Sequence, residues 1–253
     1  MFRFCREKSV DGVLQDYDLL YNQGIEKLEA SLSSDANPKP FRFNNAELIN
    51  MRVGGYISAH LAGVADAIRQ LNPSSVQEIG FGSGKNLLYM AARFPEIDFS
   101  GYELTPAGVV LAKKLQTIGK LPPNLDNLIG KVPDECRESI LNIDFKQGNA
   151  MALPLSDKSV DLTYTILALE QMAPILPDVL KEIRRTTRRY VVMVEPFGEA
   201  QTTENKIYLR ARNYFRQSMS YMDEAGFEPV AQVVHLPCKL LFGAAMLVAR
   251  VKD

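Results

Sequence analysis

The sequence predicts an α/β protein built on a seven-stranded mixed sheet with helices on both faces. Three observations lead to this fold class. A strand, a glycine-rich turn and a helix follow one another over residues 76–94. Short apolar runs then alternate with helical segments as far as residue 195, and two strand-like segments, 229–236 and 242–251, lie close enough to predict a terminal hairpin. With 253 residues, the chain is long enough to bury the core of such a domain.

The glycine-rich turn is the most informative stretch of the chain. Gly80, Gly82 and Gly84 stand at alternate positions directly after a short apolar run. Glycines allow positive φ and let a ligand approach the backbone, and the free N–H groups of the following helix then face that ligand. The dinucleotide fingerprint GxGxxG needs a further glycine at position 85 or 87, where Lys85 and Leu87 stand. The turn therefore predicts a ligand site of another kind.

The next predicted strand, 97–104, ends in a carboxylate. A strand, helix and strand within about thirty residues form a right-handed βαβ unit, which brings the carboxyl ends of both strands to one edge of the sheet. Glu103 is therefore expected beside the glycine turn. A carboxylate in that place can accept hydrogen bonds from the two vicinal hydroxyls of a ribose.

Three polar residues stand in a recognisable order: Glu78 two positions before the glycines, Glu103 at the end of the second strand, and Asn149 after the third strand. This order resembles the motifs of class I S-adenosylmethionine-dependent methyltransferases. The resemblance covers residues 72–253. It implies a Rossmann-like sheet of order 3-2-1-4-5-7-6, S-adenosyl-L-methionine as cofactor and S-adenosyl-L-homocysteine as product. The cofactor-binding residues that it implies are Glu78, Gly80, Phe81, Gly82, Gly84, Asn86, Glu103, Leu104, Asn149, Ala150, Met151 and Leu167.

In this family the end of the fourth strand faces the reacting methyl group, which makes the residues after strand 160–166 candidates for the reaction. Glu170 and His235 are the predicted catalytic residues, with His60 and Glu195 as alternative bases. The predicted substrate-contacting residues are Tyr17, Tyr21, Phe43, Arg52, Gln171, Met172 and Phe197.

The first 71 residues carry no motif of the family. Apolar residues at helical spacing predict helices over 9–32 and 46–71, and a further helix is predicted over 207–225. Two interpretations of the N-terminal part stay open: a helical cap that only packs on the core, or a lid that keeps water from the site. The predicted division is a cap or lid, 1–71, and a methyltransferase domain, 72–253, with an insertion near 119–142.

Composition limits the partners. Twenty-nine basic against thirty acidic residues give a net charge of −1, which disfavours nucleic acid. Three cysteines far apart and no cluster of metal ligands predict neither structural zinc nor a disulfide framework. The chain begins without a signal-peptide pattern and has no stretch suited to cross a membrane, so a cytoplasmic protein is expected. The oligomeric state stays open, a homodimer being one alternative.

The function expected from these observations is methyl transfer to an O or N atom of a small-molecule metabolite or natural product. Two alternatives stay open. One is an RNA methyltransferase, and the other is a catalytically inactive cofactor-binding protein that serves as a partner subunit.

Overall fold

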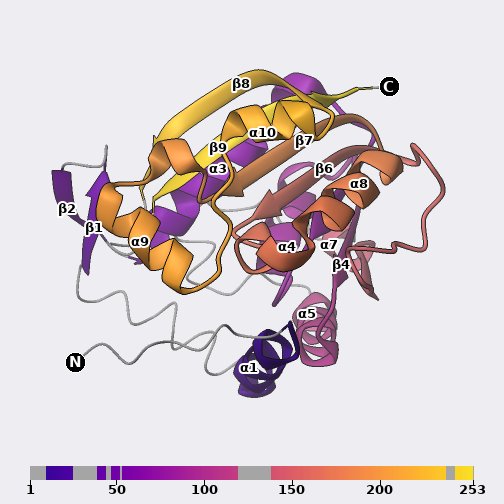
Figure 1. Cartoon of the computed structure of the whole chain (residues 1–253). Helices are drawn as coiled ribbons and strands as arrows, with labels where there is room; N and C mark the ends of the chain where they lie inside the picture. The colour runs from indigo at the N-terminus through magenta and orange to yellow at the C-terminus, as the bar shows by residue number, and fades with distance from the viewer. Residues whose placement is uncertain are drawn as a thin grey trace.

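The computed structural model describes residues 10–24, 39–43, 47–51, 53–118, 138–237 and 243–252 (Figure 1). A seven-stranded sheet lies at its centre. The strands of this sheet are β3 (Ser75–Ile79), β4 (Asp98–Glu103), β5 (Asp144–Gln147), β6 (Val160–Ile166), β7 (Thr187–Glu195), β8 (Phe227–Leu236) and β9 (Ala244–Val251).

The sheet has the order β5-β4-β3-β6-β7-β9-β8. Strands β3 to β7 pair in parallel, whereas β9 is antiparallel to both of its neighbours, β7 and β8. Counted along the chain within this sheet, the order is 3-2-1-4-5-7-6, so the predicted topology and the terminal hairpin are confirmed. The order reverses between β3 and β6, and the carboxyl ends of parallel strands at such a point form a crevice suited to a ligand.

Helices cover both faces of the sheet, as predicted. The helices are α1 (Val10–Asn22), α3 (Val53–Leu71), α4 (Lys85–Arg93), α5 (Pro106–Ile118), α7 (Glu138–Leu141), α8 (Leu176–Thr186), α9 (Thr203–Ala211) and α10 (Met219–Glu224). Three single 3₁₀ turns complete them: η3 (Leu169–Gln171), η4 (Ala173–Ile175) and η5 (Gly198–Ala200).

Strand β7 shows how the sheet divides the core. Successive side chains of a strand point to opposite faces. Val192 and Val194 accordingly belong to one hydrophobic cluster together with residues of α3, α4 and α5. Val191 and Met193 belong to a second cluster, which α8 and α10 cover. Because both faces are covered, the strand is a continuous apolar run from residue 191 to 194.

Helix α3 packs into this core although it precedes residue 72. Leu61, Val64 and Ile68, three of its residues, are at most 1% exposed and lie in the same cluster as Val76 of β3. Within the described part of the chain, no helix combines the length and the apolar character needed to cross a membrane.

Two predicted helices are wrong in part. Residues 47–51 form the strand β2 (Glu47–Met51), which pairs with β1 (Lys39–Phe43) in an antiparallel two-stranded sheet, and α3 begins only at Val53. Pairing with the preceding segment decided the conformation, because a five-residue apolar run does not distinguish strand from helix by its spacing.

The predicted helix 207–225 is two helices, α9 and α10. Asn213 adopts a left-handed conformation (φ 52°), which ends the first of them. Ser218 then caps α10 by accepting a hydrogen bond from the N–H of Tyr221 (3.2 Å).

Candidate active site

The glycine turn connects β3 to α4, and its three glycines all have positive φ, between 56° and 76°. Gly80 needs to lack a side chain because a Cβ there would lie 2.7 Å from the Cβ of Ala168, which follows β6. At Gly82 a Cβ would lie 2.5 Å from the hydroxyl oxygen of Tyr21 in α1. The turn is therefore in close contact with the end of β6 and with the N-terminal helix.

Glu103 lies at this turn, as the βαβ argument predicted. Its Oε2 accepts a hydrogen bond from the N–H of Gly82 (2.9 Å). Its Oε1 accepts from the N–H (2.9 Å) and the hydroxyl (2.7 Å) of Thr105. The carboxylate is 8% exposed, so burial and three donors fix it at the turn.

The loop after β5 joins the same edge of the sheet. The N–H of Gly148 donates to the carbonyl of Glu103 (3.0 Å), and Asn149 follows directly. Asn149 is exposed, and its Oδ1 accepts from the N–H of Met151 (3.0 Å), which leaves its amide group at the surface of the loop. Residues 82, 103 and 149 thus lie on three loops that meet at one edge, although they are far apart in sequence.

Glu78 has a different place from the one that the family motif implied. It is 1% exposed, and its two carboxylate oxygens accept from the side chains of Asn86 (2.8 Å) and Tyr164 (3.0 Å). Burial raises the pKa of Glu78 to about 7 in spite of these donors. Glu78 and Asn86 therefore tie β3, α4 and β6 together beneath the turn, with the carboxylate facing the protein.

The segment after β6 contains the predicted reaction candidates. Leu167 has φ of 51°, a strained conformation for a side chain with a Cβ, at the point where the segment turns. Oε1 of Glu195, at the end of β7, accepts from the N–H groups of Ala168 and Leu169 (3.1 Å each). Burial, and to a smaller extent the charge of the nearby Glu170, raise the pKa of Glu195 to about 8. Glu195 thus holds the strained turn that presents Glu170.

Helix α1 contributes two tyrosines to this place. The hydroxyl of Tyr17 accepts a hydrogen bond from Nε2 of Gln171, and Tyr21 lies against Gly82. The pKa values of both phenols are raised, mainly by burial, and then by Glu170 for Tyr17 and by Glu103 for Tyr21. In Figure 1, α1 lies beside α5.

Other predicted residues are not at this place. His235 is on the edge strand β8, which β9 and β7 separate from β6. Phe197 is fully buried and packs edge-on against Phe215, with ring centroids 5.3 Å apart, so it is a core residue. Arg52 and the side chain of Phe43 lie outside the described residues. The alternative base His60 is a buried residue of α3, and its Nε2 contacts the carbonyl of Pro237 (3.0 Å).

Sequence reasoning missed three residues that form this arrangement: Asp18, Thr105 as a partner of Glu103, and Tyr164 as a partner of Glu78. Thr105 carried a signal, since Thr-Pro at a helix start is a capping pattern, but its hydrogen bond to Glu103 depends on the turn of the chain. Asp18 and Tyr164 carried none, because their partners are 89 and 86 residues away.

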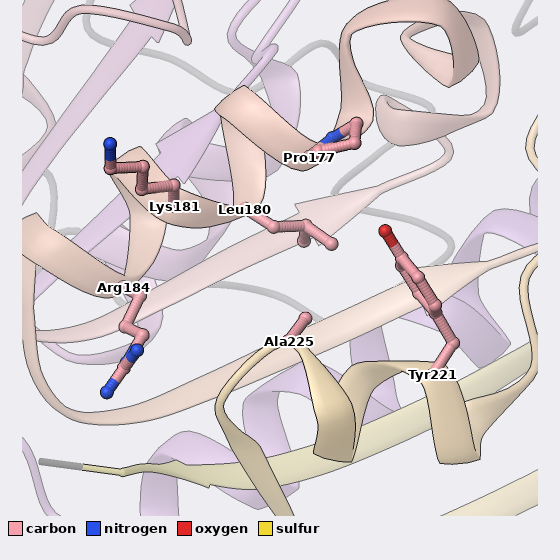
Figure 2. Close-up of a pocket in the computed structure, with 6 residues that line it drawn as sticks. All are labelled: Pro177, Leu180, Lys181, Arg184, Tyr221 and Ala225. Carbon is pink, nitrogen blue, oxygen red and sulfur yellow. The ribbon is translucent and has the colours of Figure 1, made fainter.

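A shallow pocket of about 200 Å³ lies elsewhere, between α8 and the end of α10 (Figure 2). Its lining residues are Pro177, Leu180, Lys181, Arg184, Tyr221 and Ala225. None of them is a predicted site residue. In the part of the chain that the structure describes, no group of three or more His, Cys, Asp or Glu side chains is arranged to hold a metal ion.

Comparison with known proteins shows a similarity to methyltransferases. Residues 77–193, from β3 to β7, match the family model described as "Methyltransferase domain". The tRNA (guanine-N(7)-)-methyltransferase of Paracoccus denitrificans is 27% identical over 161 residues, which are 61% of this chain and 57% of that protein. The chain thus matches little more than half the length of this curated relative.

Two solved structures illustrate the similarity of the fold. The [4+2]-cyclase SpnF superposes with a TM-score of 0.65 at 15% identity, covering 98% of both chains. Magnesium protoporphyrin IX methyltransferase from Synechocystis PCC 6803, crystallised with S-adenosylhomocysteine, superposes with a TM-score of 0.55 at 11% identity over 78% of this chain and 84% of that one. The family model covers a little less than half of the chain, and at these identities the solved structures show the fold alone. Together with the sheet order, these findings show that residues 77–193 match a methyltransferase domain and support a class I S-adenosylmethionine-dependent methyltransferase.

Proposed function

We propose that the protein transfers the methyl group of S-adenosylmethionine to an O or N atom of a small-molecule metabolite. The observation that carries this proposal is the position of α1. Tyr17 bonds Gln171 after β6, and Tyr21 lies against Gly82 of the glycine turn, which supports a small reacting site that α1 covers. A covered site suits a small acceptor and excludes water from the reaction.

The residues at the turn fit the cofactor. Glu103 has the carboxylate that vicinal ribose hydroxyls require, and the exposed amide of Asn149 has both the donor and the acceptor that an adenine edge requires. Gly82 offers backbone without a side chain. When bound, the cofactor supplies a methyl group that its sulfonium already activates. The protein has to hold the acceptor in line and keep water out.

Glu170 is the proposed proton acceptor for an O–H or N–H group of the substrate. It lies on η3, is 8% exposed, and raises the pKa values of Tyr17 and Tyr214 by its charge. For the Tyr17 and Tyr214 phenols, burial is the larger cause. Gln171, Met172 and Tyr17 are the proposed substrate contacts around it. His235 takes no part in this proposal, because its strand lies at the far edge of the sheet.

The charges disfavour a nucleic acid substrate. Glu103 and Glu170 both lie near the glycine turn and the end of β6, where their negative charges repel phosphates. Two arginines near the end of α8 and the start of β7 are engaged within the chain: Arg185 binds Glu182 and Asp157, and Arg188 binds Asp161.

The curated relative nevertheless gives a second candidate, a tRNA methyltransferase. The two candidates differ in their response to salt. An RNA substrate bound through phosphates loses affinity steeply as the salt concentration rises, whereas a small neutral or cationic acceptor loses little.

A turnover assay tests the proposal. Consumption of labelled S-adenosylmethionine is measured with a panel of amines, phenols and alcohols and, in parallel, with unmodified tRNA at 50 and 200 mM salt. We expect turnover with a member of the panel, and a Glu170→Gln variant with strongly reduced kcat and unchanged affinity for S-adenosylhomocysteine. Turnover with tRNA alone, falling with salt, would select the second candidate. Cofactor binding without turnover on either would favour a partner subunit.

A further inference from the structure

Helix α1 lies over the glycine turn with two of its leucines largely exposed. Leu19 and Leu20 are 65% and 49% exposed. The stabilisation that burial provides scales with the apolar area removed from water, so these two leucines contribute little to holding the helix. Tyr17, Asp18 and Tyr21 contact the rest of the protein, and Tyr21 packs against the hydrophobic core. Their spacing places them within one turn on the side of α1 that meets the site.

Asp18 provides a hydrogen-bond acceptor for a backbone N–H group in the first turn of helix α5. The first turn of a helix has N–H groups without partners inside the helix. Pro106 has no N–H, and the hydroxyl of Thr105, the residue before the helix, donates to Glu103 (2.7 Å). The N–H of Ala107 donates to Oδ1 of Asp18 (3.2 Å), so α1 supplies the cap from 89 residues away. The negative charge of Asp18 also suits the positive end of the α5 dipole.

This hydrogen bond attaches α1 to the loop that carries Glu103. Thr105 binds Glu103 on one side, and Ala107, two residues on, binds Asp18 on the other. Tyr21, one turn after Asp18 in the same helix, covers Gly82, which also binds Glu103. The position of α1 and access to the cofactor turn are therefore set by the same few residues.

We propose that Asp18 is a positioning residue that latches α1 over the cofactor site, and that α1 opens when Asp18 releases Ala107. The inference rests on the cofactor site of the proposed function and is independent of the acceptor. It gives the N-terminal helix a defined role: a lid that limits how fast the cofactor enters and the product leaves.

The test is the rate at which the protein releases S-adenosylhomocysteine. Labelled S-adenosylhomocysteine is bound to wild type, Asp18→Ala, Asp18→Asn and the control Gln15→Ala, and is then chased with excess unlabelled compound. Gln15 is exposed on the same helix. Since loss of a helix cap corresponds to a few-fold to thirtyfold change in an equilibrium, we expect release about 3- to 30-fold faster in Asp18→Ala. Asp18→Asn keeps an acceptor oxygen and should fall between Asp18→Ala and wild type, with Gln15→Ala at the wild-type rate. Equal rates for wild type and Asp18→Ala would overturn the latch.

Amide exchange without ligand separates the latch from a general effect on folding. In Asp18→Ala, peptides from α1 should exchange faster, whereas peptides from β6 and β7 keep their protection. Faster exchange throughout the sheet would mean that Asp18 supports the whole fold and would also overturn the proposal. If the wild type fails to bind S-adenosylhomocysteine, the cofactor assignment fails, and the exchange of α1 still decides whether Asp18 holds it.

Discussion

The backbone N–H of Gly82 donates to Oε2 of Glu103 over 2.9 Å, joining the glycine turn after β3 to the end of β4. The other oxygen of Glu103 holds Thr105, which begins the approach to α5. One carboxylate thus fixes two loops of the candidate cofactor site in relation to each other. A residue proposed to bind the ribose also organises the place where the ribose binds.

Replacing Glu103 should weaken cofactor binding. Because a carboxylate that accepts two hydroxyl hydrogen bonds contributes about 1.5–3 kcal/mol per charged bond, we expect Glu103→Ala to bind S-adenosylhomocysteine at least tenfold more weakly by calorimetry. Glu96→Ala, at an exposed carboxylate in the preceding turn, serves as control. Unchanged affinity in Glu103→Ala would refute its role at the ribose.

Two alanine substitutions in the glycine turn should have different effects. In Gly82→Ala the new Cβ meets the Tyr21 hydroxyl on α1, so we expect weaker cofactor binding with a modest loss of stability, about 1–2 kcal/mol for the left-handed conformation. In Gly84→Ala the Cβ meets Ala112 at 2.6 Å and the ring of Phe145 at 2.8 Å, inside the core.

We therefore expect Gly84→Ala to lower the melting temperature clearly more than Gly82→Ala does. Thermal unfolding with and without S-adenosylhomocysteine measures both effects. Equal destabilisation by the two substitutions would contradict the prediction, because it would mean that Tyr21 yields to a new Cβ no more easily than the core around Gly84 does.

The buried Glu78 should make stability depend on pH. Burial raises its pKa from the usual 4.5 to about 7, so between these values the folded protein keeps a proton that the unfolded chain releases. Stability therefore falls as the pH rises through this window, by roughly 3 kcal/mol at about 1.4 kcal/mol per unit. In Glu78→Gln this loss disappears.

Urea unfolding at pH 5 and pH 8 checks this prediction. The comparison between wild type and Glu78→Gln isolates the contribution of Glu78, because Glu195, whose pKa is also raised, is present in both proteins. Parallel pH profiles for the two proteins would contradict a raised pKa at Glu78.

Asp161, at the start of β6, should contribute to the free energy of unfolding. Although burial alone would raise its pKa, hydrogen bonds from Ser74 and Arg188 lower it to about 2. Asp161→Ala leaves the N–H and hydroxyl of Ser74 without their acceptor, so we expect a loss of about 1–3 kcal/mol in urea unfolding at pH 7.

The stabilisation by Asp161 is present above its unfolded pKa, near 3.8, and is lost as the pH falls toward 2, so wild type and variant should converge in acid. Asp66→Ala is the matched control, because Asp66 pairs with Arg69 at 2.6 Å on the surface, with side chains more than half exposed. A surface pair contributes about 0–1 kcal/mol. Equal losses from the two variants would contradict the prediction.

Local sequence signals were sufficient to predict the strands of the central sheet. Each strand from β3 to β7 is a short segment that contains buried apolar residues and is bounded by turn residues, and the helices α4, α5 and α8 have clear helical spacing. The same kind of reasoning failed at β2, where five residues matched both patterns, and at Asn213, where one left-handed residue divides a helix. In both places a single contact or dihedral decided between conformations of similar local preference.

In the candidate site, too, the sequence predicted the positions of some residues correctly and of others wrongly. The positions of Gly82, Glu103 and Asn149 followed from the topology of the βαβ unit, because parallel strands end at one edge. Glu78 was expected at the ligand, but the structure places its carboxylate beneath the turn, since Tyr164 approaches from a strand 86 residues away. Phe197 was expected at the substrate and lies in the core against Phe215.

The sequence by itself determined the fold class, the strand order implied by the resemblance to the family, and the loops at which the candidate cofactor residues lie. Those properties depend on spacing within about thirty residues. Only the tertiary structure decided that α1 covers the glycine turn, that Asp18 caps α5, and that Glu195 holds the strained turn at Leu167. Such contacts join segments distant in the chain, and no local pattern of polarity specifies which distant donor a buried or half-buried carboxylate will meet.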